Sequence, residues 1–317
     1  MKLSFRVGAI PVRILPSFFV TTLVISLLPG AEPIQLVLWT LVVLASVLVH
    51  ELGHAFAGLA CGLHPRVDLH GFGGTTSWAP DARLSPAARI GISLAGPGTG
   101  FAVGGLVAAY AIARGPGLSF VAGALLAPFD LAPAPRVASW TDFVCDRLLF
   151  VNVGWGALNL LPMLPLDGGN VMTQAFAAAR WGERPARIVS LAVAALAVCA
   201  ALWAHWLWPA GLATLFVASN WRGLEDLKAR EHDAPMRASL ENAYAALDVK
   251  DATRVLAIAR PIALGAKTPA VRAEALQLLA FGFLLEGRVA DADAAVAALP
   301  RGFSPHPTWL ELRARAS

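Results

Sequence analysis

The chain has 317 residues, enough for two ordinary domains, but 57% of them are hydrophobic and only 15% are charged, and the mean hydropathy is +0.62. So little charge cannot cover the surface of a water-soluble protein, so part of the chain is expected to lie in lipid. The formal net charge is only +4 and the basic residues are scattered, which excludes a nucleic-acid-binding stripe. The three cysteines lie far apart without a CxxC pair, which excludes a disulfide-stapled secreted protein.

Six apolar stretches are predicted to cross the membrane, because a helix needs about 17 to 25 apolar residues to do so. They are Ile14–Leu28, Ile34–Ala60, Ala87–Ala113, Phe143–Leu164, Ile188–Trp206 and the shorter Leu207–Trp221. The apolar segment Leu118–Phe129 is too short to span and contains Pro128, so we expect a surface-lying connection.

The basic residues predict the orientation of a multi-pass protein in the cell membrane. Twelve Lys and Arg residues lie near the ends of the spans on one side, against three on the other. Cytoplasmic loops carry the excess of positive charge, so both termini are predicted to be cytoplasmic. An alternative interpretation of Met1–Ala31 as a cleaved signal peptide lacks a clear cleavage site.

The composition changes at about Gly223, where charged residues become frequent and apolar ones recur at helical spacing. We therefore predict a membrane-embedded domain over residues 1–222 and a cytoplasmic helical domain over residues 223–317. Helical hairpins are expected over Ala238–Ala263 and Ala270–Leu299, the second similar to a tetratricopeptide unit, with a generic helical tail as the alternative. The expected fold is an all-α polytopic membrane protein with short membrane-associated β-hairpins and this C-terminal helical-hairpin domain.

Ionisable residues cluster inside the second predicted span, where residues 49–56 read VHELGHAF. Residues four apart share one face of a helix, so His50 and His54 can hold one ion while Glu51 reaches the same space. Two imidazoles suit Zn²⁺, which lowers the pKa of a bound water to about 7 so that a carboxylate can accept its proton. An unmetallated polar cluster is the alternative, but ionisable groups in an apolar span are costly and usually bind ions or line a cavity. The pattern predicts hydrolysis with one zinc ion.

A third ligand is expected outside this helix. His64 and His70, in the Gly-rich and Pro-containing stretch beyond it, could reach back, but each is expected to be a surface-loop residue. The better candidate is Asp167, in the segment NLLPMLPLDGG over residues 159–169. Its two prolines break the fourth span, and irregular backbone at membrane depth is tolerated where it is buried or lines a cavity.

The predicted topology agrees with this choice, because the second and fourth spans run in the same direction. Asp167 and His54 are therefore expected to converge near the cytoplasmic face. The alternative, an ordinary Asp-Gly-Gly turn, does not explain the polar Asn159 within an apolar span.

Glycines near the predicted site indicate two further structural features, a closely packed helix and a tight turn. Gly96, Gly100 and Gly104 recur every four residues in the third span, so a neighbouring helix is expected to pack closely against them. Val67–His70 and Thr75–Trp78 flank a Gly-rich turn and form either a β-hairpin, whose free edge can receive an extended peptide, or a connecting loop.

The pairing of HExxH in one span with NxxPxxxLDG after another resembles the site-2 protease family of intramembrane zinc metalloproteases. SLAGP at residues 93–97 and FGG at 72–74 also resemble the family, and Leu3–Pro16 is similar to a hairpin often found before its first helix. The resemblance covers about Met1–Trp221. It implies that the zinc ligands are His50, His54 and Asp167, that Glu51 is the general base, and that Asn159 contacts substrate or supports the site.

The resemblance implies an intramembrane endopeptidase that cuts transmembrane proteins near the cytoplasmic face, in regulated intramembrane proteolysis. The expected partners are a transmembrane protein substrate, the lipid bilayer and an adaptor or regulator on the C-terminal domain, with no nucleic acid. A zinc-binding transporter is one alternative, although it would need ionisable residues leading to the outer face. A catalytically silent relative that binds membrane proteins is another, although the intact Glu51 argues against it.

Overall fold

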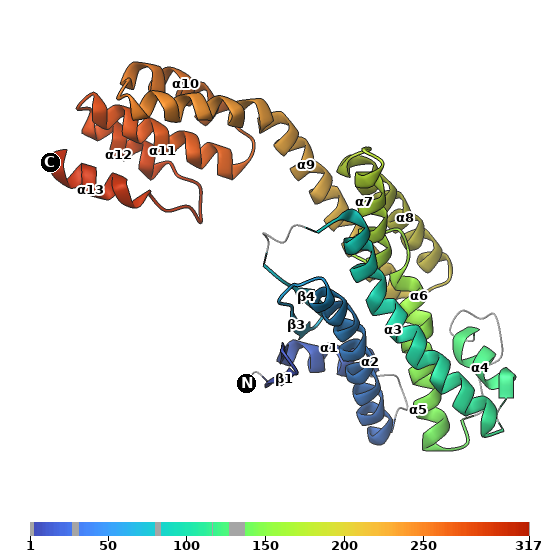
Figure 1. Ribbon diagram of the computed structural model, residues 1–317. Helices are drawn as coiled ribbons and strands as arrows, with labels where there is room; N and C mark the ends of the chain where they lie inside the picture. The colour runs from blue at the N-terminus through green and yellow to red at the C-terminus, as the bar shows by residue number, and fades with distance from the viewer. Residues whose placement is uncertain (1–2, 27–31, 80–83, 116, 127–136, 317) are drawn as a thin grey trace. The chain divides into compact units, whose positions relative to one another are not determined.

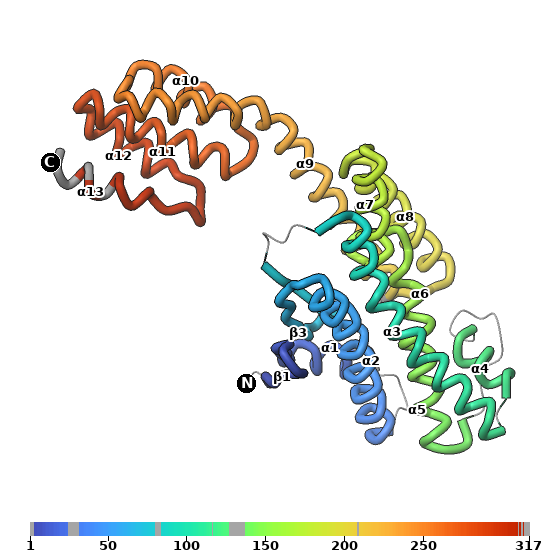
Figure 2. Tube along the Cα trace, viewed as in Figure 1, coloured from blue at the N-terminus to red at the C-terminus, as the bar shows by residue number. Residues whose placement is uncertain are grey.

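The computed structural model describes residues 3–26, 32–79, 84–115, 117–126 and 137–316 (Figures 1 and 2). The chain divides into two compact units, Met1–Asn220 and Trp221–Ser317. The described residues are mostly helical and include one small sheet. The two units are described separately.

Both predicted hairpins belong to one four-stranded sheet in the first unit. Its strands are β1 (Leu3–Val7), β2 (Ile10–Ile14), β3 (Arg66–His70) and β4 (Gly73–Ser77), in the order β1-β2-β3-β4. The outer pairs are antiparallel hairpins, and β2 and β3 pair in parallel. The prediction of hairpins is confirmed, but their union through a parallel pair was not predicted.

The sheet is fixed to the rest of the unit by its alternating side chains. Every second residue of β2 is buried, and these residues pack with β3, Phe18 and Ala55 in one apolar cluster. On the other face, Arg13 forms a bidentate ion pair with Asp68 at 2.6 and 2.7 Å, and this contact holds the pKa of Asp68 below its usual range. The two hairpins therefore share one apolar core and one ion pair.

The helices of the first unit follow the predicted apolar stretches, with the differences given below. They are α1 (Pro16–Ser26), α2 (Pro33–Ala60), α3 (Pro86–Ala113), α4 (Gly117–Leu126), α5 (Trp140–Leu149), the π-helix η2 (Phe150–Trp155), α6 (Gly156–Asn159), α7 (Asp167–Ala178) and α8 (Glu183–Trp203). Helix α2 begins with a capping box between Glu32 and Gln35, and α3 begins with Ser85 as its N-cap; a proline follows each cap. These local signals explain where the two longest helices of the unit start.

Among the described residues, α2, α3 and α8 are long and apolar enough to cross a membrane. They correspond to the second, third and fifth predicted spans, and they support a membrane protein. The fourth expected span is a broken helix, α5–η2–α6, that ends at Asn159. The first contains the 11-residue α1, followed by residues 27–31, which lie outside the described residues. The arrangement of six spans stays a prediction.

The segment that we expected to be a surface-lying connection forms α4, and one side of it is buried. Phe120, Val121 and Ala124 pack against Cys145 and Leu149 of α5 in a separate apolar cluster. A short helix can bury one face against neighbours even when it is too short to span, which length alone did not reveal. Residues 127–136, including Pro128 and Phe129, lie outside the described residues.

The second unit is helical, and its core contains one apolar cluster. Its helices are the end of α9 (Leu207–Asp248), α10 (Ala252–Gly265), α11 (Pro269–Leu285), α12 (Val289–Ala297) and α13 (Pro307–Ala316). Leu240, Val255, Leu278 and Phe283 come from three helices and share this core, and Gly287 has a φ of 75° in the turn before α12. The predicted helical hairpins are present, whereas the tetratricopeptide likeness stays a prediction. The composition change at Gly223 falls inside α9, so the helix itself does not end there.

Candidate metal centre

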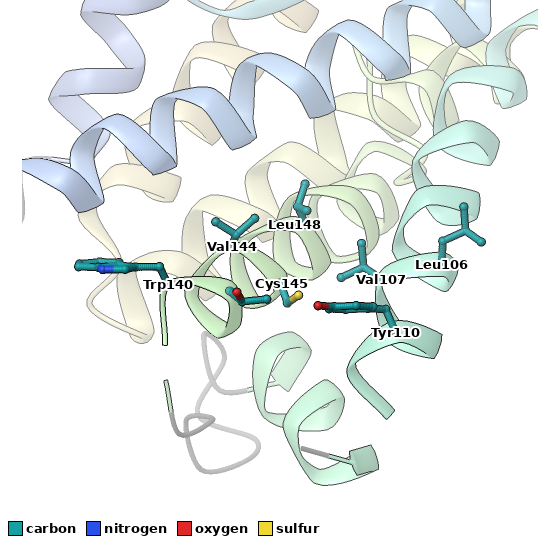
Figure 3. A pocket seen from close by; sticks show the side chains of 8 residues that line it. Leu106, Val107, Tyr110, Trp140, Val144, Cys145 and Leu148 are labelled. Carbon is teal, nitrogen blue, oxygen red and sulfur yellow. The ribbon is translucent and has the colours of Figure 1, made fainter. Parts of the chain in front are cut away.

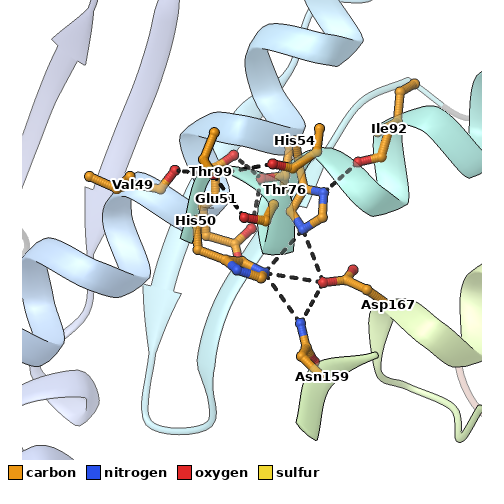
Figure 4. Close-up of polar contacts among 11 residues, drawn as sticks. Val49, His50, Glu51, His54, Thr76, Ile92, Thr99, Asn159 and Asp167 are labelled. Atoms are coloured by element: carbon orange, nitrogen blue, oxygen red, sulfur yellow. Dashed lines mark hydrogen bonds and ion pairs between the residues drawn. The ribbon is translucent and has the colours of Figure 1, made fainter. Parts of the chain in front are cut away.

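Two histidines of α2 and one aspartate converge, as Figure 4 shows. His50 Nε2 lies 3.2 Å from His54 Nε2, and Asp167 Oδ2 lies 3.1 Å from the first nitrogen and 3.3 Å from the second. The two imidazoles share one face of α2, one turn apart, as the HExxH spacing predicted. Their donor atoms and that of Asp167 form a group that can hold a metal ion.

The spacing of these three atoms fits zinc. In a tetrahedral site with Zn–N bonds of about 2.0 to 2.1 Å, neighbouring donors lie roughly 3.3 Å apart. The three separations of 3.1 to 3.3 Å are therefore close to those along one face of such a tetrahedron. Two imidazoles and one carboxylate also leave the fourth position open, which is typical of catalytic zinc sites.

The orientation of the His54 ring is fixed by α3. His54 Nδ1 lies 2.6 Å from the carbonyl oxygen of Ile92, which can only accept a hydrogen bond. Nδ1 therefore carries the proton of the neutral ring, and the lone pair is left on Nε2, the atom that faces His50 and Asp167. Backbone carbonyls that hold the far nitrogen in this way are typical of metal-binding histidines.

Asp167 reaches the site because the chain breaks sharply between α6 and α7. It is the first residue of α7, so the alternative of an ordinary Asp-Gly-Gly turn is wrong. A Cβ at Gly168 would meet the backbone of Leu160 and Leu161, and one at Gly169 would meet that of Met163. Only residues without a side chain permit this tight return of the chain, which brings Asp167 back towards α2.

Asn159, the last residue of α6, contacts the same atoms. Its Nδ2 donates a hydrogen bond to Asp167 Oδ2 and lies 3.3 Å from His50 Nε2. The donor holds the carboxylate, so the geometry supports a role for Asn159 in orienting Asp167.

Glu51 is held by the β-hairpin that follows α2. Its side chain is buried, at 6% exposure, and the hydroxyl of Thr76 donates to its Oε2 at 2.7 Å. A Cβ at Gly74 would collide with the Glu51 carboxyl group, so β4 lies directly against it. The sequence does not predict the contact of Thr76 with Glu51, because a threonine in a hairpin gives no sign of the helix it will face.

The small residues of α3 permit the close packing that their spacing predicted. A Cβ at Gly96 would collide with the ring of His54, and one at Gly104 would meet the side chain of Val153. At Gly100 an added Cβ would lie 3.1 Å from the carbonyl oxygen of Asn152. The face of α3 that carries these glycines therefore packs against α2 at one level and against the broken helix at two others.

The two other histidines considered as ligands lie outside this group. His70 ends β3 and pairs with the hydroxyl of Thr75 at 2.8 Å, so it is a strand residue and not the loop residue that we expected. His64 is exposed in the segment between α2 and β3. Neither belongs to the metal-holding group found among the described residues.

An apolar groove of about 530 Å³ lies between α3 and α5 (Figure 3). It is lined by Leu106, Val107, Tyr110, Trp140, Thr141, Val144, Cys145 and Leu148. None of the predicted site residues lines it. The candidate functional site is therefore the group of His50, His54 and Asp167, and the groove is not part of it.

Replacing Gly96 with Ala is expected to disrupt the metal centre, because the added methyl group needs the space of the His54 ring. We expect the zinc content of purified protein to fall at least tenfold in Gly96→Ala, since a displaced ligand weakens binding by that order. The matched control is Gly98→Ala, on the same helix, where no atom lies within 4 Å of an added Cβ. Equal zinc content in both variants, measured by atomic emission, would contradict the geometry.

Comparisons with known proteins agree on one family. The family model described as Peptidase family M50 matches residues 38–202. The putative zinc metalloprotease Rip3 of Mycobacterium tuberculosis is 32% identical over 163 residues, which cover 48% of this chain and 36% of that protein. The putative zinc metalloprotease sll0528 of Synechocystis sp. is 30% identical over 188 residues, covering 54% of this chain and 44% of that protein. The matches span less than half the length of these curated relatives.

One solved structure also matches part of this chain. The site-2 protease from Methanocaldococcus jannaschii matches with a TM-score of 0.45 and 16% sequence identity, over 71% of this chain and 95% of that one. The family model itself covers more than half of the 317 residues, and it includes both histidines, Glu51, Asn159 and Asp167. The resemblance noted in the sequence is thus confirmed, and the chain belongs to peptidase family M50, the site-2 protease family of membrane metalloproteases.

Proposed function

We propose that this chain is an intramembrane zinc endopeptidase that cuts transmembrane proteins near the cytoplasmic face, in regulated intramembrane proteolysis. The observation that carries the proposal is the group of His50, His54 and Asp167, whose donor atoms lie 3.1 to 3.3 Å apart beside a buried Glu51. The first three residues are the proposed ligands of one Zn²⁺ ion, and Glu51 is the proposed general base. His50, Glu51 and His54 lie on α2, a helix apolar enough to cross a membrane, which supports cleavage within or close to the bilayer.

Zinc bound by these residues would supply a Lewis acid and an acidified water near neutral pH. Glu51 accepts the proton of the attacking water and later returns it to the leaving amine. The Thr76 hydroxyl donates to one carboxylate oxygen of Glu51, so the other oxygen remains to take up the proton. Asn159 and Ile92 hold Asp167 and His54 in their orientations, as described above.

The free edge of β4 supports a mode of substrate binding. Among the described strands, β4 pairs only with β3, and its residues Gly74 and Thr76 contact Glu51. A helical substrate hides its carbonyls in its own hydrogen bonds, so it must unwind before hydrolysis. We propose that the unwound segment adds to the edge of β4 as a further strand, next to the general base.

Glu51→Gln is expected to lower kcat by about 10²-fold to 10⁴-fold, because the amide cannot accept the proton. Its zinc content is expected to stay close to that of the unchanged protein, because Glu51 is not a proposed ligand. The matched control is Glu32→Gln, an exposed residue at the start of the same helix. Measuring both on a fluorogenic transmembrane peptide decides the assignment, and proteolysis retained in Glu51→Gln would refute it.

Substrates with a helix-breaking residue near the cleaved bond are expected to be cut faster than uniformly helical ones. The reason is that unwinding one turn requires the loss of several backbone hydrogen bonds, and Pro or Gly lowers that cost. The test compares kcat/KM for two model transmembrane peptides that differ by one Leu→Pro change. Equal rates would argue against strand addition.

The second unit is proposed to be a cytoplasmic docking or regulatory module for an adaptor. The first unit, Met1–Asn220, contains every proposed site residue, so the chemistry does not need the second unit. Truncation after Arg222 is therefore expected to leave cleavage of a short model peptide unchanged and to reduce processing of the natural substrate several-fold in cells. That substrate can be identified by co-purification with the Glu51→Gln protein. Unchanged processing in cells would show that the module has no such role.

A further inference from the structure

A buried polar contact joins α2 to the middle of the broken helix α5–η2–α6. Asn152 is 3% exposed and Ser46 is 5% exposed, and Asn152 Nδ2 donates to Ser46 Oγ at 2.8 Å. Both residues lie in apolar segments, where a polar group without a partner is costly. The contact joins two buried side chains from different helices, so it helps to specify how the two helices meet. We call this pair the polar junction.

Asn152 is the third residue of the π-helix η2, which follows α5 directly. The same side-chain amide donates to the carbonyl oxygen of Leu148 at 2.9 Å, one turn earlier in α5. The backbone carbonyl of Asn152 faces Gly100 of α3, where a Cβ would lie 3.1 Å away. Within η2, Asn152 is the buried residue. A single residue thus contacts its own helix, α2 and α3.

The polar junction lies along the helices from the metal centre. Ser46 and His50 are four residues apart on α2, so they share one face. Asn152 and Asn159 are seven residues apart on the broken helix, about two turns. Asn159 lies 3.3 Å from His50 Nε2 and donates to Asp167 Oδ2. The broken helix therefore meets one face of α2 at two polar contacts, and the second of them is the metal centre.

The direction in which Asn159 points depends on the position and rotation of the π-helix η2. A π-turn closes its hydrogen bonds over five residues instead of four, so it changes the rotation of every residue that follows. Asn159 is the last residue of the short helix α6, which follows η2 directly. We propose that Asn152 is a positioning residue for the metal centre: its bond to Ser46 seats η2 so that Asn159 faces His50 and Asp167. This inference rests on the proposed function.

The test uses the full-length protein in detergent and two variants. Asn152→Leu keeps the approximate size and loses the donor, and Ser46→Ala removes the acceptor with a small change in volume. Zinc affinity is measured by competition with a chelator, and kcat and KM are measured on a model transmembrane peptide. Both variants are expected to bind zinc about tenfold more weakly and to lose about tenfold in kcat with KM unchanged, as for other residues that orient metal ligands.

The matched control is Thr22→Val, which removes a buried hydroxyl whose partners, among the described residues, are the carbonyls of Phe18 and Phe19 in its own helix. A general effect of losing a buried polar group would lower zinc affinity in this control as well. Zinc affinity and kcat equal to those of the unchanged protein are expected. An equal loss in Thr22→Val and Asn152→Leu would overturn the positioning role.

The decisive arm repeats Asn152→Leu in a protein that already carries Asn159→Ala. If Asn152 acts through Asn159, the second change causes no further loss of zinc affinity, because the group that it positions is absent. Losses that multiply in the double variant would overturn the proposal, as would normal zinc affinity in both single variants. Failure of both single variants to fold would do the same, by showing that the junction serves folding alone. Absence of zinc binding and cleavage in the unchanged protein would instead refute the proposed function.

Discussion

Three atoms with lone pairs, two imidazole nitrogens and one carboxylate oxygen, lie 3.1 to 3.3 Å apart inside an apolar helical unit. Polar groups at membrane depth are costly unless they pair with one another or bind an ion. The surrounding chain must therefore hold them in place. Helix α2 supplies two of them at fixed spacing, α3 fixes one ring through Ile92, and the break before α7 delivers the third. These three parts of the first unit together keep the two imidazole nitrogens and the carboxylate oxygen close to one another.

Glycines, which have no side chain, are as important to the metal centre as its polar groups. Gly96 makes room for the His54 ring, Gly74 for the Glu51 carboxyl group, and Gly168 for the return of the chain before α7. At Gly96 and Gly74 the backbone approaches a functional side chain more closely than a Cβ would permit, and at Gly168 it approaches the backbone of Leu160 and Leu161 in the same way. The same small residues thus provide both helix packing and the shape of the site, so packing and chemistry cannot be separated here.

The sequence predicted the proposed ligands because their signals are local or chemically unusual. HExxH is a helical spacing, and Asp167 follows a proline-broken span with Asn159 before it. The glycine spacing of α3 likewise predicted close packing, which the structure confirms. Thr76 and the parallel pairing of β2 with β3 were not predictable, because they join residues that lie far apart along the chain. The burial of α4 and the π-helix η2 were missed for a related reason: both depend on neighbouring helices, and neither changes the apolar composition from which spans are predicted.

The pairing of β2 with β3 also limits how the chain passes through the bilayer. The two strands share one sheet, with Val12 opposite Val67, although α1 and α2 lie between them in the sequence. A sheet of this size occupies one side of the membrane, and β3 follows soon after the end of α2. A topology in which α2 spans the bilayer and β2 pairs with β3 therefore requires an even number of passages between the two hairpins, whichever way the protein is inserted.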